Sequence, residues 1–394
     1  MVNRITKTYE DAVASALLPG ITAISGKKSG IKPDLHAGRD EAFTDATICA
    51  MASMTKLMTA VSVMKCVEQG TLDLDKDVKP LLPEMGRYGI ITGFDDDKNQ
   101  ARFEADSTPV TLRMLLCHTS GHEYDWMNPL LGKWRASRNE VPWSGPLLTD
   151  KSAIPLVFKP GTNFAYGAGA DWAGRLVEVA SGMTLEDFMC KYICTPLGTE
   201  KDFSFWPEDK PEMKSRMATF STLNEAGEPP ASDASAFDIR FGGKECLGGA
   251  GGFGSAQAYY TFLSAVFRRD SRLLTEESYK ELFRPQFDSE MEETFNRYLT
   301  SSPVHEQLIG MSIPRSIRKS WSLAGMVVLD DQEGRFKKGT TFWGGVPCMM
   351  WFMDHQAGIC GTAFCQMLPP MHPRIMGLHE EFQRGSFEAA LKEA

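Results

Sequence analysis

A serine and a lysine three residues apart have the types and spacing for covalent catalysis. Ser53-Met54-Thr55-Lys56 fits the pattern S-x-x-K. Residues i and i+3 share one face of a helix, so the lysine amine would lie beside the serine hydroxyl. A serine hydroxyl becomes a nucleophile when a neighbouring base takes its proton. The start of a helix also stabilises a forming oxyanion through its free N–H groups. The spacing therefore predicts a nucleophile at Ser53.

The pattern has little specificity by itself, because it occurs five times in the chain. The matches are Ser25/Lys28, Ser29/Lys32, Ser53/Lys56, Ser62/Lys65 and Ser316/Lys319. Only Ser53 opens a strongly amphipathic segment, in which apolar residues recur with helical spacing over residues 53–69 until Gly70. The alternative interpretation of Ser53 is a plain helix N-cap.

Two distant segments favour catalysis at Ser53. Tyr166-Gly167-Ala168-Gly169 places a phenol on a tight glycine-rich turn before a helix expected over about 170–182. Phe342-Trp343-Gly344-Gly345 stands just before a C-terminal strand. A tyrosine on a turn or a Trp-Gly-Gly is more often structural when it occurs alone. Together with a helix-opening S-x-x-K, and in this order along the chain, the two segments indicate a catalytic site far more specifically than either does alone.

With these segments the chain resembles the serine β-lactamase and penicillin-binding-protein superfamily. Within it the chain is similar to the family VIII carboxylesterases, and most similar to the fungal lovastatin-type acyltransferases. The resemblance spans about residues 8 to 370. The segments that carry it begin at Ser53, Leu115, Tyr124, Tyr166, Trp343, Trp351 and Gln366.

The resemblance implies a role for each matching residue. Ser53 would form the acyl-enzyme, and Lys56 and Tyr166 would share the general-base and general-acid work. The backbone N–H groups of Ser53 and Val346 would form the oxyanion hole. The residues implied on the substrate side are Trp343, Gly344, Gly345, Val346 and Tyr124.

The sequence departs from the penicillin-recognising pattern at two positions. Ala168 stands where those enzymes carry the Asn of Tyr-x-Asn, and Trp343 stands where they carry the Lys of Lys-Thr-Gly. The missing lysine removes the cation that would hold a β-lactam carboxylate. An aromatic wall and two glycines suit a larger, neutral ester, so we expect esters rather than β-lactams as substrates.

Two other motifs are assigned structural roles. Residues 249–254 satisfy G-x-G-x-x-G, but Lys244-Glu245-Cys246 rather than a buried strand precedes them. The resemblance implies a tight loop beneath the active site instead. His118 and His122 have the spacing of a metal pair, but Gly121 breaks a helix between them. Hydrogen-bonded structural histidines are therefore expected, with no metal and no cofactor.

The order of the expected elements predicts the fold class. A helix over 8–18 and a strand over 21–24 open the chain, helices and a loop-dominated stretch over 203–250 follow, and strands over 322–329, 349–353 and 359–367 come near the end. A polar helix from about Leu378 closes the chain. We expect an α/β (α+β), β-lactamase-like fold whose antiparallel sheet is completed by both termini and flanked by helices, with an inserted mainly helical subdomain.

These elements are expected to form one catalytic domain over residues 1–394. Its approximate subdomains would be 1–60 plus 310–394, the sheet region, and 61–309, the helical and loop region.

Composition restricts the partners and the location. A net charge of -9 and a pI near 5.4 argue against nucleic acid and anionic membranes, which attract basic proteins. The mixed, charged N-terminus is not typical of a signal peptide, and no run of about 18 apolar residues occurs. Nine scattered cysteines are typical of reduced thiols. A cytoplasmic location is expected.

Three functions remain open from the sequence. The first is an acyltransferase or transesterase that moves an acyl group from a thioester or ester through acyl-Ser53 to the alcohol of a secondary-metabolite-like substrate. The second is a carboxylesterase, with water as acceptor. The third is a catalytically silent binding protein, against which the intact Ser53, Lys56 and Tyr166 argue. The expected partners are a small-molecule donor, an alcohol acceptor and an acyl carrier protein.

Overall fold

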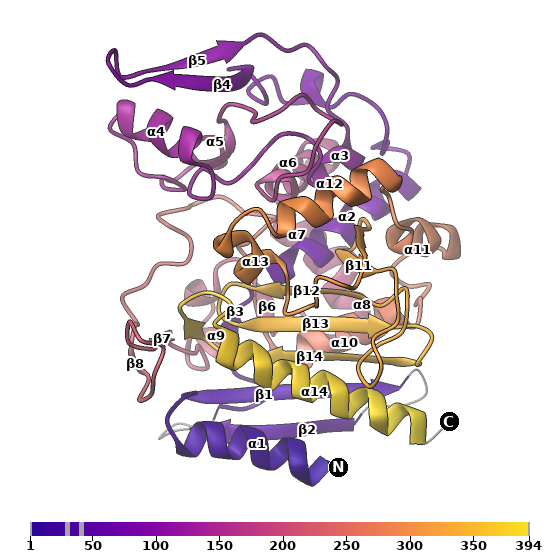
Figure 1. Ribbon diagram of the computed structural model, residues 1–394. Coiled ribbons are helices and arrows are strands. Elements are labelled where there is room, and N and C mark those ends of the chain that lie inside the picture. Colours follow the sequence, from indigo (N-terminus) through magenta and orange to yellow (C-terminus); the bar gives the residue numbers. More distant parts are fainter. Residues whose placement is uncertain (1, 28–31, 39–42, 393–394) are drawn as a thin grey trace.

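A seven-stranded antiparallel sheet lies in one half of the molecule, and the other half consists mainly of helices with a small two-stranded sheet at its far end (Figure 1). The computed structural model describes residues 2–27, 32–38 and 43–392. In spatial order the strands are β10 (Lys319–Trp321), β11 (Met326–Val328), β12 (Thr341–Gly345), β13 (Met349–Asp354), β14 (Ile359–Phe364), β1 (Gly20–Lys27) and β2 (Lys32–Gly38).

Both ends of the chain complete this sheet, as the sequence predicts. Strand β1 pairs antiparallel with β14, with Thr22 opposite Phe364, and β2 pairs with β1 at the edge. Every residue of β13 and β14 is buried. A strand that is buried on both faces cannot alternate between polar and apolar residues, which explains the continuous apolar run Met349-Met350-Trp351-Phe352-Met353.

Helices cover both faces of the sheet. The terminal helices α1 (Val2–Ala14) and α14 (Pro373–Lys392) pack against each other and against β1, β2 and β14. Helix α10 (Ala256–Phe267), from the middle of the chain, packs against β1 and β14 as well. The division into sheet and helical subdomains stays a prediction.

The helical half is built around α2 (Thr55–Glu68), which packs against α6 (Gly169–Ser181), α7 (Leu185–Met189) and α11 (Glu276–Phe283). Because neighbours surround α2, most of its residues are buried. The other helices are α3 (Leu112–Leu116), α4 (Pro129–Ser137), α5 (Leu148–Ser152), α8 (Thr195–Leu197), α9 (Pro211–Lys214), α12 (Ser289–Leu299) and α13 (Pro303–Ile309). Single turns are η1 (Ala52–Met54), η2 (Lys79–Leu81), η3 (Cys190–Cys194) and η4 (Pro207–Asp209).

Three small sheets complete the molecule. They consist of β3 (Ile48–Ala50) with β9 (Phe253–Ser255) and β6 (Phe203–Ser204), of β15 (Met367–Leu368) with β7 (Ser221–Thr222) and β8 (Ser232–Asp233), and of β4 (Ile90–Asp95) with β5 (Gln100–Glu104). The expected loop-dominated stretch over 203–250 contains only short elements.

Several boundaries differ from the expectation. Helix α1 begins at Val2 and ends at Ala14, earlier than the predicted 8–18. Helix α14 begins at Pro373 rather than about Leu378, because proline fits the first turn of a helix, where its missing N–H is not needed. The strand predicted over 322–329 is confined to β11, after a turn in which the Ser322 hydroxyl bonds the backbone of Gly325.

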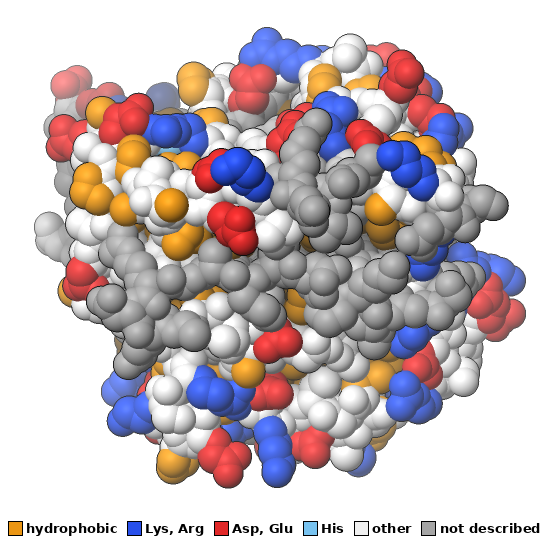
Figure 2. Space-filling view, turned by 90° about the horizontal axis from the view of Figure 1, so that it is seen from below, with side chains coloured by type: hydrophobic (Ala, Val, Ile, Leu, Met, Phe, Trp, Pro, Cys, Tyr) orange, Lys and Arg blue, Asp and Glu red, His pale blue; other side chains and the backbone are white. Residues whose placement is uncertain are grey.

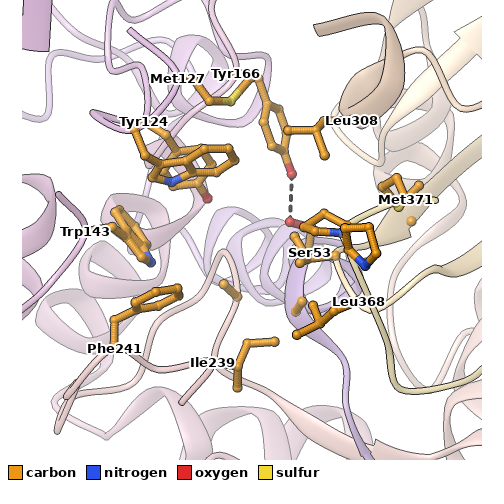
Figure 3. A pocket seen from close by; sticks show the side chains of 18 of the residues that line it. Ser53, Tyr124, Met127, Trp143, Tyr166, Ile239, Phe241, Leu308, Leu368 and Met371 are labelled. Carbon is orange, nitrogen blue, oxygen red and sulfur yellow. Dashed lines mark hydrogen bonds between the residues drawn. The ribbon is translucent and has the colours of Figure 1, made fainter. Parts of the chain in front are cut away.

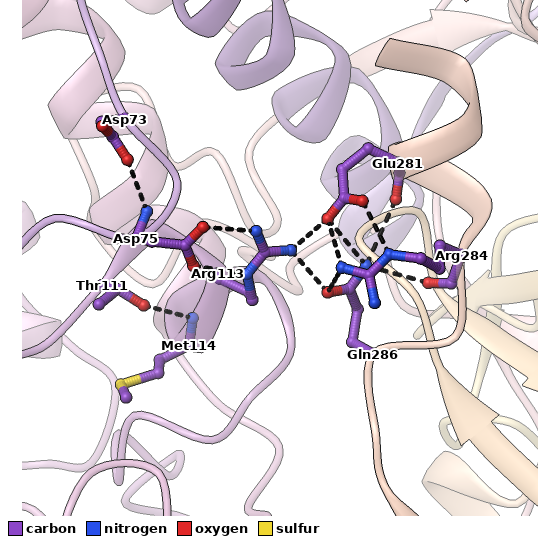
Figure 4. Close-up of polar contacts among 8 residues, drawn as sticks. All are labelled: Asp73, Asp75, Thr111, Arg113, Met114, Glu281, Arg284 and Gln286. Atoms are coloured by element: carbon purple, nitrogen blue, oxygen red, sulfur yellow. Dashed lines mark hydrogen bonds and ion pairs between the residues drawn. The ribbon is translucent and has the colours of Figure 1, made fainter. Parts of the chain in front are cut away.

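A polar cluster ties the helices together at the surface (Figure 4). The Arg113 guanidinium, on α3, donates to Asp75 with Nε–Oδ1 2.6 Å and Nη2–Oδ2 2.7 Å, and also pairs with Glu281 of α11. Glu281 bonds Arg284, and these arginines hold the pKa of the Glu281 carboxyl at about 2. The cluster thereby fixes α11, which packs on α2.

Seen from below, the molecule carries acidic and basic side chains intermingled over the described part of that surface (Figure 2). The net charge of -9 is therefore not gathered there. Among the helices of the described ranges, none combines the length and apolarity needed to cross a bilayer.

Candidate active site

Ser53 lies in η1, a sharp connection between strand β3 and helix α2, and not at the first residue of the α-helix itself. The preceding Ala52 has φ 46°, a left-handed conformation that is uncommon for a residue with a side chain. The Tyr259 hydroxyl donates to the Met54 carbonyl at 3.1 Å and fixes the turn from below. The turn brings Ser53 to the wall of a cavity.

Lys56 lies one turn further along, with its ammonium against the Ser53 hydroxyl. Its Nζ donates to Ser53 Oγ at 3.1 Å, to the Gly249 carbonyl at 2.8 Å and to Tyr124 Oη at 3.2 Å. An ammonium group has three N–H donors, so these contacts satisfy it completely. Burial raises the pKa of the Tyr124 phenol, which therefore stays protonated.

Tyr166 approaches Ser53 as well (Figure 3). Its Oη donates to Ser53 Oγ at 2.8 Å and accepts from Trp343 Nε1 at 3.1 Å. The Lys56 ammonium lies 4.7 Å from the centre of the Tyr166 ring, a cation–π contact. The structure thus brings Ser53, Lys56, Tyr166, Tyr124 and Trp343 together from segments far apart in the chain.

The remaining predicted residues lie at the same place. Gly344, Gly345 and Val346, at the end of β12, line the cavity beside Ser53. A Cβ atom at Gly345 would lie 2.5 Å from the Met51 carbonyl oxygen, so this strand end packs directly on the backbone that precedes Ser53. The catalytic and binding roles of these residues stay predictions.

Asp171 is a further polar residue near this cluster, and the sequence did not single it out. It is fully buried, and its Oδ1 accepts from the Gly249 N–H at 2.8 Å. Gly249 thus links Asp171 to Lys56, because its N–H donates to the carboxylate and its carbonyl accepts from the lysine. Burial raises the pKa of Asp171 to about 6, although Lys56 and the Gly249 N–H lower it. The one feature of the sequence that could have pointed to Asp171 is its position five residues after Tyr166, within the expected helix.

The glycine-rich motif over 249–254 and the two histidines with the spacing of a metal pair form part of the structure around the site. The 249–254 loop supplies the carbonyl that holds Lys56, in agreement with the expected loop beneath the site. His118 packs on Tyr166 and faces the Gly167 N–H at 3.3 Å, and His122 bonds Ser120. Burial lowers the pKa of both histidines. The described residues include no cluster of three or more His, Cys, Asp or Glu side chains that suits a metal ion.

The competing serine–lysine pairs do not form such a site where they are described. Ser62 donates to the Met58 carbonyl within α2, and Lys65 bonds Glu68 and the Leu273 carbonyl. Lys319 donates to two backbone carbonyls near it. Residues 28–31 of the two N-terminal pairs lie outside the described part of the chain.

A cavity of about 470 Å³ opens above Ser53, and its lining is mainly apolar. Tyr124, Trp143 and Phe241 form one wall, and Leu308, Leu368 and Met371 lie opposite (Figure 3). Many of these residues come from loops, which is why periodicity in the sequence did not identify them. No charged residue is among the described residues that line the cavity.

Comparisons with known proteins show the family of the chain. Residues 10–383 match the family described as Beta-lactamase. Monacolin J acid methylbutanoyltransferase from Aspergillus terreus is 35% identical over 343 residues, which cover 86% of this chain and 82% of that protein. Lovastatin esterase from Penicillium rubens is 31% identical over 330 residues, which cover 83% of this chain and 81% of the relative.

Solved structures lead to the same family. A mutant of simvastatin synthase from Aspergillus terreus superposes with a TM-score of 0.89 at 32% identity, covering 99% of this chain and 95% of that one. The fold class predicted from the sequence is therefore confirmed. The chain belongs to the Beta-lactamase family and is one of its acyl-transferring enzymes.

Proposed function

We propose that Ser53 takes an acyl group from an ester or thioester and passes it to an alcohol bound in the apolar cavity. The observation that carries this proposal is the Ser53 hydroxyl itself. It is held at 3.1 Å by Lys56 and at 2.8 Å by Tyr166, on the wall of a cavity large enough for a drug-sized substrate.

In the acylation step, Ser53 Oγ attacks the carbonyl carbon of the donor. The hydroxyl proton passes to Lys56 as a neutral amine or to Tyr166 as a phenolate, because an ammonium or a protonated phenol cannot take a further proton. Both groups lie within hydrogen-bond distance of Ser53 Oγ. The N–H groups of Ser53 and Val346 stabilise the negative oxygen of the tetrahedral intermediate. The bond to the donor oxygen or sulfur then breaks, and the departing group takes the proton. Acyl-Ser53 remains.

In the second step the acceptor alcohol attacks acyl-Ser53, and the same two side chains carry its proton to Ser53 Oγ. An apolar cavity favours a bulky alcohol over water, because little in its lining binds water strongly. Trp343 takes part through its bond to Tyr166 Oη, and Tyr124 through its bond to Lys56.

The names of the relatives suggest the substrates. A short branched acyl group such as methylbutanoyl, and a large secondary-metabolite alcohol as acceptor, follow from the methylbutanoyltransferase. An acyl carrier protein as the thioester donor belongs to the same proposal. The nine cysteines, all unpaired and eight of them buried, support a cytoplasmic location.

Carboxylester hydrolysis is the second candidate, and the similarity to a lovastatin esterase favours it. Product analysis separates the two functions. The protein is incubated with a methylbutanoyl thioester of a small thiol and with a polycyclic alcohol, with Ser53→Ala as the matched control. Transfer predicts an ester product that depends on Ser53. Release of the free acid alone, in the presence of the alcohol, would contradict transfer and support hydrolysis.

A further inference from the structure

The turn that carries Val346 is held from below by the two terminal helices. Residues 346–348 connect β12 to β13. The Cys348 N–H donates to the Val346 carbonyl at 2.7 Å, which closes a tight turn around Pro347, a residue whose ring fixes φ as that turn requires. Cys348 has φ 59°. A non-glycine residue adopts this conformation only when its surroundings hold it there.

The carbonyl groups of this turn all have partners in the core. The Val346 carbonyl accepts from the Met371 N–H at 3.4 Å and the Pro347 carbonyl from the Met367 N–H at 3.2 Å. The Cys348 carbonyl accepts from His379 Nε2 at 2.6 Å and, less closely, from the Cys365 thiol at 3.1 Å. Met367 and Met371 flank a segment that itself lines the cavity. The orientation of the turn therefore depends on the groups beneath it.

The hydrogen bonds determine the tautomer of His379. A carbonyl oxygen can only accept, so Nε2 carries the proton. Burial lowers the pKa of His379 to about 4, which leaves Nδ1 without a proton at neutral pH. Nδ1 therefore accepts from the Tyr9 hydroxyl, 2.9 Å away. Tyr9 and His379 are both fully buried, and a chain of two bonds joins α1 through α14 to the turn.

We infer that Tyr9 and His379 are positioning residues for acylation, because they hold the turn that directs the Val346 N–H to the carbonyl oxygen of the donor. This inference rests on the proposed function. Neither residue lines the cavity, so each acts through the Cys348 carbonyl. The residues lie 370 positions apart, at opposite ends of the chain, and the terminal helices thus contribute to the oxyanion hole as well as covering the sheet.

Acylation with an ester labelled with carbon-13 at its carbonyl tests the inference. Hydrogen bonds from an oxyanion hole lower the stretching frequency of the acyl-serine carbonyl, which infrared difference spectra measure. Tyr9→Phe and His379→Leu are expected to raise this frequency and to slow acylation about tenfold, with little change in KM. His379→Gln, whose amide can still donate to the Cys348 carbonyl, is expected to recover most of the rate.

Ser386→Ala is the matched control. Ser386 lies on the same helix as His379 and bonds Ser25 of β1 at 2.9 Å, with no bond to the turn. We expect it to lower the melting temperature without changing the carbonyl frequency. A different result is that the native protein forms acyl-Ser53 and that Tyr9→Phe and His379→Leu keep its carbonyl stretching frequency and its acylation rate. That result would overturn this inference and leave the proposed function standing. Absence of acyl-Ser53 in the native protein would overturn the proposed function, and the inference with it.

Discussion

The Lys56 and Tyr166 side chains contact the Ser53 hydroxyl, and each of them makes a further hydrogen bond that fixes its position. Lys56 is bound to the Gly249 carbonyl at 2.8 Å, and Tyr166 accepts from the Trp343 indole at 3.1 Å. Because both side chains are buried, neither bond competes with bulk water. Such held partners are what a nucleophile needs if its proton is to move without rearrangement of the site.

Removal of either partner should slow acylation and leave the fold intact. We expect Lys56→Met and Tyr166→Phe each to lower the rate of acylation by a p-nitrophenyl ester roughly 10²- to 10⁴-fold. Lys65→Met is the matched control, since Lys65 is the lysine of another S-x-x-K pair in the same helix and bonds Glu68. Equal losses in Lys56→Met and Lys65→Met, with circular dichroism unchanged, would argue against the assigned role.

The buried carboxyl of Asp171 should make stability depend on pH. Its pKa is raised from 3.8 to about 6, so between these values the native protein holds a proton that the unfolded chain releases. The free energy of unfolding contributed by this group therefore falls as pH rises through that window, by up to about 3 kcal/mol. Denaturant titrations of the native protein and Asp171→Asn at pH 4, 5 and 7 check this. A difference between the two that does not vary with pH would contradict it.

At the scale of elements, the sequence predicted what periodicity and punctuation can show. The apolar spacing after Ser53 and the stop at Gly70 located α2, and Gly182 located the end of α6, where its φ is 67°. The 3-10 turn that holds Ser53 was not predicted, because a single turn has no period. The cavity wall of Trp143 and Phe241 was missed for a similar reason, since these residues lie in loops that only the tertiary fold brings together.

The contact between the end of β12 and the segment before Ser53 should not tolerate a methyl group. Gly345→Ala places a Cβ atom against the Met51 carbonyl, a backbone group that cannot move aside. We expect a loss of about 1–3 kcal/mol in the free energy of unfolding and strongly reduced acylation, as measured by denaturant titration and an esterase assay.

Gly377→Ala is the comparison for that variant. Gly377 lies in α14 with nothing within 4 Å of a new Cβ atom, so alanine should stabilise the helix by about 0.5–1 kcal/mol and leave activity unchanged. Gly345→Ala behaving like Gly377→Ala would show that the strand end and the Ser53 turn are not packed as described.

At the scale of the whole molecule, the strand order confirms the prediction that both termini complete one sheet. The order of strand-like and helical segments along the sequence was enough to predict it. The sequence could not show that α10, from the middle of the chain, packs on the same sheet. That contact depends on which apolar face meets which, and many pairings satisfy the same hydrophobic pattern.

The uncharged cavity should discriminate against β-lactams. The sequence resemblance places Trp343 where penicillin-recognising enzymes would carry a lysine, and no lysine or arginine is among the described lining residues. A β-lactam carboxylate would thus lose its hydration without gaining a cation. We expect nitrocefin hydrolysis to be negligible beside the turnover of a p-nitrophenyl ester. Nitrocefin turnover comparable with that of the ester would contradict the interpretation of Trp343.

The central claim is that the chain works through an acyl group on Ser53, and the mass of the intact protein tests it most directly. The protein is mixed with a p-nitrophenyl ester, quenched in acid within seconds and weighed by mass spectrometry, with Ser53→Ala treated in parallel. We predict that the native protein gains the mass of one acyl group, which peptide mapping places on Ser53, and that Ser53→Ala gains nothing. A native protein that releases p-nitrophenol without carrying an acyl group, or an equal adduct on Ser53→Ala, would contradict the account.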